Sequence, residues 1–100
     1  MKHVVKERCV RNIFSFYQNV SKKYKHTYSI ELMRSNIVDA YDAMFLIEQS
    51  LLRRRPTLKR WQDQGWHMAH AGHWYYAYTI NDDTVTIEDA RHEQNMHEDK

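Results

Sequence analysis

Three histidines, at positions His70, His73 and His92, lie close together in the predicted strands of the last third of the chain. Imidazole titrates near neutral pH, so one histidine can accept a proton while another donates one. Three imidazoles can also hold a zinc ion that keeps an open coordination position. A third interpretation is that all three face solvent and have no chemical role. The residue types alone leave these alternatives open.

A strongly cationic segment precedes the histidines. Its charged residues are Arg53, Arg54, Arg55, Lys59 and Arg60. Guanidinium groups match phosphate oxygens, so the segment is predicted to bind phosphate. The alternative is a solvated helix end, because cations are also favoured at a helix C-terminus. That alternative suits Arg53 and Arg54 but not Lys59 and Arg60, which follow a proline. Trp74 and the tyrosines can either stack on nucleobases or pack in the sheet.

Length and composition limit the class of protein. One hundred residues, of which 42% are hydrophobic and 28% charged, predict one globular domain spanning 1–100 rather than a disordered chain. The single cysteine, Cys9, excludes an internal disulfide and a multi-cysteine zinc site. No apolar run approaches the roughly 18 residues of a membrane span, and the N-terminus is too polar for a signal peptide. We therefore expect a cytoplasmic protein without membrane partners.

The charge is distributed unevenly along the chain. Residues 1–80 hold 13 Lys and Arg but 6 Asp and Glu, whereas residues 81–100 hold 2 and 7. A basic body with an acidic tail suits nucleic acid or an acidic partner, although a mixed surface is the simpler alternative. The polar residues 93–100 are expected to be either a disordered tail or a terminal helical turn carrying His97.

Apolar spacing predicts two helices before the cationic segment. In the first, over about 8–24, steps of three and four residues join Val10, Ile13, Tyr17, Val20 and Tyr24. In the second, which Ser29 can cap, the same steps join Ile30, Met33, Ile37, Ala40, Met44, Ile47 and Leu51. A further stripe of Val38, Tyr41, Phe45 and Leu52 makes this helix so apolar that we expect it to be buried on more than one side.

Beyond the proline the period changes from 3.6 to 2. Segments 65–70, 73–80 and 84–91 read as three strands of an antiparallel meander, and His3–Val5 as a short first strand. A helical hairpin beside such a meander predicts an α+β fold in the order β-α-α-β-β-β. The hairpin should pack on one face of a small, mainly antiparallel sheet.

Hairpin register then places the histidines. A two-residue loop at 71–72 pairs His70 with His73, and a loop at 82–83 pairs Ile80 with Val85 and, further along, His73 with His92. All three imidazoles are then expected in one row on the exposed face, with Arg91 at the strand end pointing to the other side. The opposite face, expected to cover the helices, carries Tyr76, Tyr78, Ile80, Val85 and Ile87.

This order of elements resembles the RelE/ParE family of toxin–antitoxin toxins. Segment 58–68 resembles the lead into the family's second strand, 73–87 resembles its central hairpin, and 90–95 resembles its terminal segment. The resemblance implies a cognate antitoxin as partner. It also implies one of two activities: RelE-like toxins cut messenger RNA in the ribosomal A site, whereas ParE-like toxins inhibit DNA gyrase by binding it. A non-toxic, metal-binding relative is a further alternative.

The YafQ-like cleaving branch is the most similar. His70 and His92 match its histidines and Trp74 its tryptophan, whereas His73 stands where that branch has an acid. The implied chemistry needs no metal or cofactor, because the RNA 2′-hydroxyl attacks the adjacent phosphate and the 5′-oxygen leaves. By this resemblance His70 or His73 is the base and His92 the acid.

The same resemblance assigns the binding groups. Arg91, with Lys59 or Arg60, would stabilise the charge of the transition state. Tyr75 or Trp74 would hold a nucleobase by stacking. We treat these roles as hypotheses.

Overall fold

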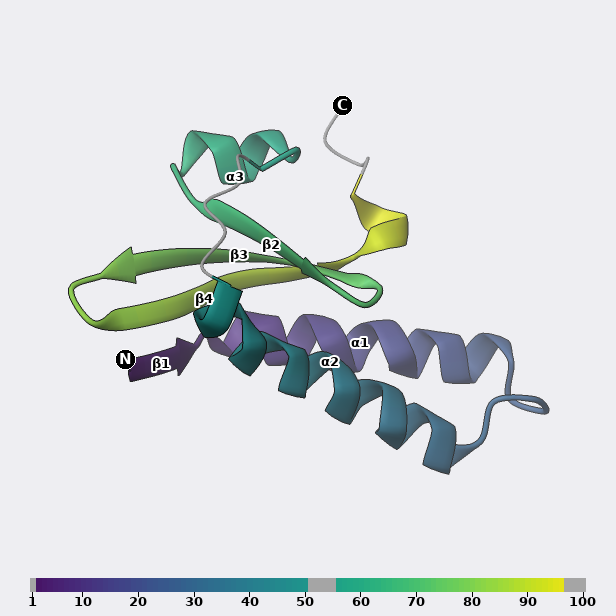
Figure 1. The fold of residues 1–100 in the computed structure, drawn as a ribbon. Coiled ribbons are helices and arrows are strands. Elements are labelled where there is room, and N and C mark those ends of the chain that lie inside the picture. The colour runs from purple at the N-terminus through teal and green to yellow at the C-terminus, as the bar shows by residue number, and fades with distance from the viewer. Residues whose placement is uncertain (1, 51–55, 97–100) are drawn as a thin grey trace.

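The computed structural model describes residues 2–50 and 56–96 and has the predicted α+β layout. Its elements are β1 (Lys2–Val5), α1 (Glu7–Lys23), α2 (Ile30–Ser50), α3 (Lys59–Asp63), β2 (His67–Ala71), β3 (Trp74–Asn81), β4 (Thr84–His92) and a 3₁₀ turn (Glu93–Asn95). The sheet order is β1-β4-β3-β2, with β1 parallel to β4 and the other pairs antiparallel. The hairpin of α1 and α2 covers one face of this sheet, and α3 lies over the other (Figure 1).

Helix α1 follows the predicted periodicity in its middle and departs from it at its ends. Ile13 and Tyr17 are buried, as is Cys9, whereas Tyr24 is 50% exposed because it follows the last turn of the helix. The Cys9 thiol donates to the carbonyl of Ile87, and burial raises its pKa to about 12. A thiol with so high a pKa is not a nucleophile near neutral pH.

Helix α2 begins as predicted but is buried on one side only. The amide of Leu32 donates to the Ser29 hydroxyl at 3.1 Å, which is the expected N-cap. The predicted core stripe is buried at Ile37, Ala40, Met44 and Ile47, whereas Ile30, its first residue, is 60% exposed. Leu51, at its end, lies outside the described residues.

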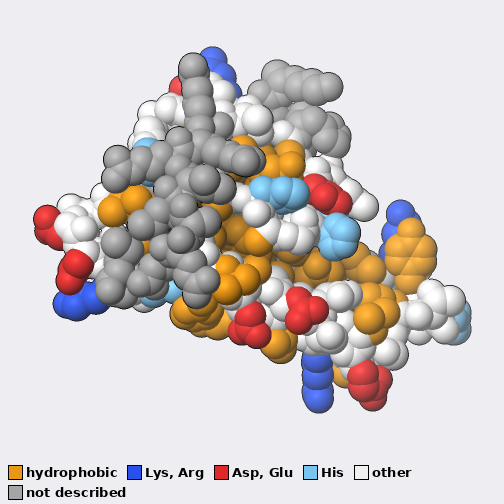
Figure 2. Space-filling model, viewed as in Figure 1, with side chains coloured by type: hydrophobic (Ala, Val, Ile, Leu, Met, Phe, Trp, Pro, Cys, Tyr) orange, Lys and Arg blue, Asp and Glu red, His pale blue; other side chains and the backbone are white. Residues whose placement is uncertain are grey.

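The second stripe of α2 is not buried, so the prediction of burial on more than one side is wrong. Val38, Tyr41 and Phe45 are 53%, 38% and 44% exposed, because in the described chain the sheet and α1 pack against the other side of the helix. Figure 2 shows hydrophobic side chains reaching the surface over α2. Leu52, the last residue of this stripe, falls outside the described residues. Of the helices in residues 2–50 and 56–96, none is both long and apolar enough to cross a membrane.

The main core lies between the sheet and the α1–α2 hairpin. It contains the predicted sheet face, since Tyr76, Tyr78, Val85 and Ile87 are fully buried there and Ile80 packs against them. Alternation along β3 and β4 therefore predicted correctly which face the helices cover.

A second, smaller core lies on the opposite face of the sheet. The periodicity does not predict α3, which forms there because Leu58 and Trp61 bury themselves against Met68 and Ala77. Trp61 is fully buried, and its indole Nε1 donates to the Asp89 carboxylate at 3.0 Å. Part of the face that we expected to be exposed is therefore covered.

Candidate functional site

The register of β3 with β4 changes halfway along the pair. The predicted pairs Ile80–Val85 and Tyr78–Ile87 are present, but the next pair joins Ala77 to Asp89, so Glu88 is an extra, bulged residue. The predicted pairing of His73 with His92 is therefore wrong.

The bulge exchanges the faces of the last four residues of β4, 89–92. His92 pairs with Trp74 and points to the side of the α1–α2 hairpin, where its ring stacks on Phe16. Arg91 pairs with Tyr75, which belongs to the core cluster on the opposite face of the sheet. The predicted orientations of Arg91 and His92 are thus reversed, since one inserted residue moves every following side chain to the other face.

Hydrogen bonds from several elements hold the bulge. The Thr79 hydroxyl donates to the Glu88 carboxylate at 2.9 Å, and the buried Asp89 carboxylate accepts from Asn12 and from Trp61. Asn12 also donates to the carbonyl of Ala90, beyond the point at which β1 stops pairing with β4. Helices α1 and α3 therefore clamp the same short segment from both sides.

The first hairpin turns one residue later than predicted. Ala71 pairs with Trp74 and His70 with Tyr75, so the loop is Gly72–His73 and the predicted pairing of His70 with His73 is wrong. Gly72 has a φ of +62°, a conformation that glycine adopts without steric cost. A two-residue hairpin loop with glycine first is a known pattern, so Gly72 is the feature that could have placed this turn.

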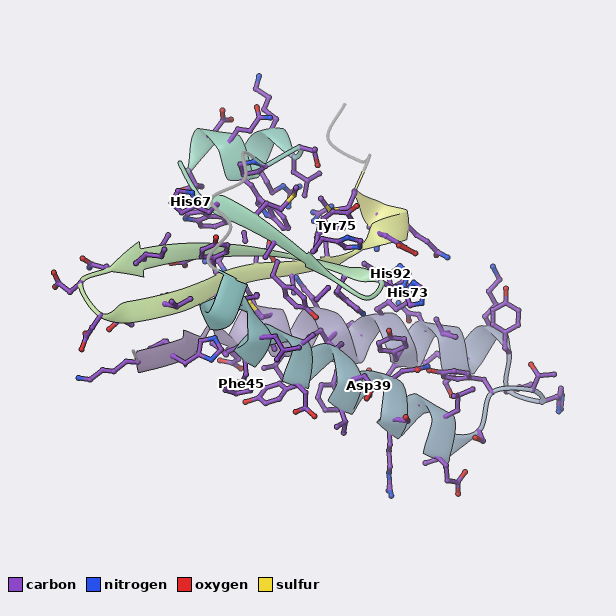
Figure 3. The ribbon with its side chains drawn as sticks, in the orientation of Figure 1. Asp39, Phe45, His67, His73, Tyr75 and His92 are labelled. Atoms are coloured by element: carbon purple, nitrogen blue, oxygen red, sulfur yellow. The ribbon has the colours of Figure 1, made fainter. Side chains whose placement is uncertain are left out.

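These two changes replace the predicted row of three imidazoles by a pair. The ring centroids of His73 and His92 lie 6.0 Å apart with 24° between their planes, and Figure 3 shows the two side chains together at the end of the sheet. His70 instead stacks on Tyr75, with centroids 4.3 Å apart.

His92 is enclosed by aromatic rings. It is 8% exposed, stacks on Phe16 at 4.0 Å and meets the edge of Trp74 at 5.4 Å. Burial lowers the pKa of His92 below its ordinary value of 6.5, an effect that the Glu93 carboxylate partly opposes and His73 reinforces. The amide of Gln94 donates to His92 Nδ1 at 3.2 Å. A neutral His92 therefore carries its proton on Nε2.

His73 is exposed and held by a carboxylate. Its Nδ1 lies 2.9 Å from Glu93 Oε1, and its side chain is 74% exposed. The hydrogen bond from His73 holds the pKa of Glu93 below its ordinary value, so the carboxylate is ionised at neutral pH. With the proton of His73 on Nδ1, the lone pair of Nε2 is directed away from Glu93.

Cavities surround this pair. One of about 240 Å³ is lined by His92, Arg91, Phe16 and Trp74 together with three asparagines, Asn12, Asn19 and Asn95. Another, of about 200 Å³, lies between α2 and the β2–β3 turn and is lined in part by His73. Figure 2 shows histidine side chains at the surface in this part of the molecule, beside acidic ones.

The predicted RNA-binding residues are dispersed. Arg91 is half-buried, lines the 240 Å³ cavity and donates to the carbonyl of Asn95. Trp74 is 3% exposed and its indole donates to the Tyr17 hydroxyl, so it forms a cavity wall rather than an open stacking platform. Lys59 and Arg60 are exposed on α3, over the sheet face opposite the α1–α2 hairpin. The predicted Arg53, Arg54 and Arg55 lie outside the described residues.

Two side chains of the site were missed by sequence reasoning. Glu93 holds His73, and Phe16 forms the stacking surface of His92. Glu93 directly follows His92 in the chain, and a carboxylate beside a candidate catalytic histidine indicates a possible partner. Glu93 could therefore have been predicted from the sequence. The partnership of Phe16 with His92 was not, because it depends on the bulge.

No group of three or more His, Cys, Asp or Glu side chains within residues 2–50 and 56–96 is arranged to hold a metal ion. The helical turn that was one alternative for the tail is present at Glu93–Asn95, whereas His97 lies outside the described residues. A scan against models of known protein families finds no match, and a search of curated proteins finds no significant relative. The proposal for its function therefore rests on the site and on the sequence resemblance to the RelE/ParE toxins.

Proposed function

We propose that this protein is the toxin of a toxin–antitoxin pair, a metal-independent endoribonuclease that cuts messenger RNA on the ribosome. The observation that carries the proposal is the pair of imidazoles beside a cavity, in which a carboxylate holds exposed His73 and burial lowers the pKa of His92. Two histidines in different environments are what a reaction needs when it removes one proton and adds another.

His73 is the base in this mechanism. Its Nε2 accepts the proton of the RNA 2′-hydroxyl, while Glu93 orients the ring and stabilises the imidazolium that forms. The resemblance left His70 or His73 for this role. We assign it to His73, because the ring of His70 stacks on Tyr75 whereas that of His73 stacks beside His92.

His92 and Arg91 leave β4 on opposite faces, but both line the 240 Å³ cavity, and in this mechanism both act on a phosphate held there. In its protonated form His92 donates the Nε2 proton to the departing 5′-oxygen, and the Arg91 guanidinium stabilises the additional negative charge of the transition state. The attacking and leaving oxygens lie on opposite sides of phosphorus, so the acid and the base must be well separated. A centroid distance of 6.0 Å between the two rings meets that requirement.

The test uses the purified full chain with translating ribosomes and a defined messenger RNA. We expect cleavage that leaves a 2′,3′-cyclic phosphate and is abolished by a 2′-deoxy sugar at the cut site, because the 2′-oxygen is the nucleophile. The His73→Ala variant should lose this activity, and the matched His67→Ala variant should keep it, since His67 contacts Tyr78 at the other end of β2. Cleavage of the deoxy substrate, or full activity of His73→Ala, would refute the mechanism.

One observation favours the ParE-like alternative, inhibition of DNA gyrase through protein binding. Tyr41 and Phe45 form an exposed aromatic pair on α2, with centroids 5.4 Å apart, and exposed apolar patches commonly mark protein contacts. The same patch would suit the cognate antitoxin. Induction of the chain in cells separates the two activities, because gyrase inhibition produces a DNA-damage response with intact transcripts and ribonuclease activity produces cut transcripts.

A further inference from the structure

We infer that a second cavity beside His92 binds a nucleobase of the RNA adjacent to the phosphate that is cut. This inference rests on the proposed ribonuclease activity, and it names the part of the substrate that the protein reads. The cavity measures about 350 Å³ and lies along α1 and the start of α2. A volume of this size is within the range of small-ligand sites and accommodates a nucleobase with part of its sugar.

The two cavities adjoin each other. Phe16, Asn19 and His92 line both the 350 Å³ cavity and the 240 Å³ cavity that contains Arg91. A nucleotide whose phosphate contacts His92 and Arg91 therefore has its neighbouring base at the entrance of the larger cavity.

The walls of the larger cavity are aromatic. Phe16, Tyr17, Tyr24 and Tyr28 all line it, and stacking on such rings is the usual way in which proteins hold unpaired bases. At its rim the Lys23 ammonium lies 5.5 Å from the centroid of the exposed Tyr24 ring. A cation at this position suits the next phosphate of the RNA backbone.

The polar groups of the cavity match the edge of a base. The Tyr17 hydroxyl accepts from Trp74 at 2.9 Å and the Tyr28 hydroxyl accepts from Asn36 at 2.6 Å. Each phenol keeps one hydrogen to donate, and within the described chain neither hydrogen has an acceptor. Burial raises the pKa of Tyr17, which keeps this donor protonated.

The same groups also provide acceptors. Asn36 and Asn19, whose side chains carry amide oxygens, line the cavity together with the two tyrosines. Base edges present donors and acceptors in patterns that differ between the four bases. A purely apolar ligand would leave the phenol hydrogens unpaired, at a cost in binding free energy. The arrangement therefore favours a base over an aliphatic or simple aromatic ligand.

The experiment measures binding of the four nucleoside 3′-monophosphates to the full chain by NMR. The reporter is the indole N–H signal of Trp74, assigned with a Trp74→Phe variant, because that group donates to Tyr17 at the cavity wall. We expect saturable shifts of the Trp74 signal that differ in affinity between the four nucleotides, with the Trp61 signal unchanged.

Two variants remove polar groups while keeping the cavity shape or the aromatic wall. Tyr28→Phe and Asn36→Ala should each weaken the preferred nucleotide by roughly threefold to tenfold, the expected effect of one hydrogen bond. The Tyr41→Phe variant, on the exposed side of α2, should bind as the wild type does. Equal affinity for all four nucleotides, or unchanged binding by the Tyr28→Phe/Asn36→Ala double variant, would overturn the inference.

The same measurements separate this inference from the proposed activity. Selective nucleotide binding at Trp74 by a chain that cuts no RNA supports the base site and refutes the ribonuclease. RNA cleavage whose base preference is untouched by the double variant supports the ribonuclease and refutes the base site. Thermal unfolding of each variant confirms that the protein measured is folded.

Discussion

The two ends of the β3–β4 ladder differ in how well the alternation of apolar and polar residues predicts which residues pair and which face each side chain occupies. Near the turn, residues 78–81 and 84–87 alternate regularly and pair with each other as the alternation predicts. Beyond the bulge at Glu88, residues 89–92 face the opposite way from that prediction. The comparison shows that one inserted residue, held by distant hydrogen bonds, decides which side chains form the site.

The largest expected effect is a loss of RNA cleavage, and it should separate His92 from His70. A regular ladder without the bulge would place both histidines in the same row. His92→Gln should lower RNA cleavage by about 10²–10⁴-fold, the usual contribution of a general acid or base. His70→Gln should change it little, since that ring stacks on Tyr75. Single-turnover cleavage rates measure both effects. Equal losses of cleavage in the two variants would contradict the division of roles and would support the single row of three histidines that a regular ladder predicts.

The clamp at the bulge can be broken at its buried carboxylate. Asp89→Ala leaves the buried indole N–H of Trp61 without its acceptor and removes one of the two acceptors of Asn12, so the free energy of unfolding should fall by about 3 kcal/mol. The control is Asp42→Ala, which removes an exposed carboxylate from α2. In this variant the free energy of unfolding should fall by less than about 0.5 kcal/mol. Urea denaturation measures both, and similar losses would contradict the clamp.

Glu93 tests the exposed half of the site. Glu93→Gln keeps the size of the side chain but removes the negative charge that stabilises a protonated His73, so cleavage should fall by about tenfold with little change in substrate binding. The control is Glu31→Gln, which removes an exposed carboxylate from the first turn of α2, away from the bulge and the histidines. A loss that appears only in KM would assign Glu93 to RNA binding instead.

The smallest expected effect is the pH dependence of stability. The pKa of His92 is lowered by folding, so the unfolded chain binds more protons and stability is lost as the pH falls below about 6.5. Urea midpoints should therefore decrease between pH 7.5 and 5.5, and less so in His92→Gln. An unchanged slope in the variant would show that His92 titrates alike in the folded and unfolded states.

The cleavage profile should reflect the same lowered pKa. Because burial lowers the pKa of His92, the acid form of this histidine becomes more populated as the pH falls, so the rate of the wild type should increase as the pH falls from 8 toward 6.5. The His70→Gln variant should follow the same profile. A rate that increases continuously with pH would remove His92 from the role of acid.

Periodicity and local chemistry account for the parts of the fold that were predicted. Ser29 caps α2 through its own side chain, and Ile13 and Tyr17 face the core because they lie on one side of a helix. The turn at Asp82–Asp83 was placed correctly as well. Each of these features depends on residues close together in the chain.

The wrong predictions depend on contacts between distant segments. The exposure of Val38 and Phe45 follows from how few elements pack around α2 in the described chain, which an apolar count along one helix does not reveal. Helix α3 has only five residues, too few for a helical period of apolar residues to be recognised in the sequence. It is stabilised by the burial of Trp61 against the sheet.

The sequence by itself determined the α+β layout, the covered face of the sheet and the gathering of histidines near one end of the strands, because strand and helix periods and turn residues act locally. Only the tertiary structure decided that His70 lies apart from His73 and His92, that Glu93 joins this pair, and that His92 faces the helices. The reason is that Asn12 and Trp61, far away in the chain, hold Asp89 at the bulge and so set the face on which the last residues of β4 lie.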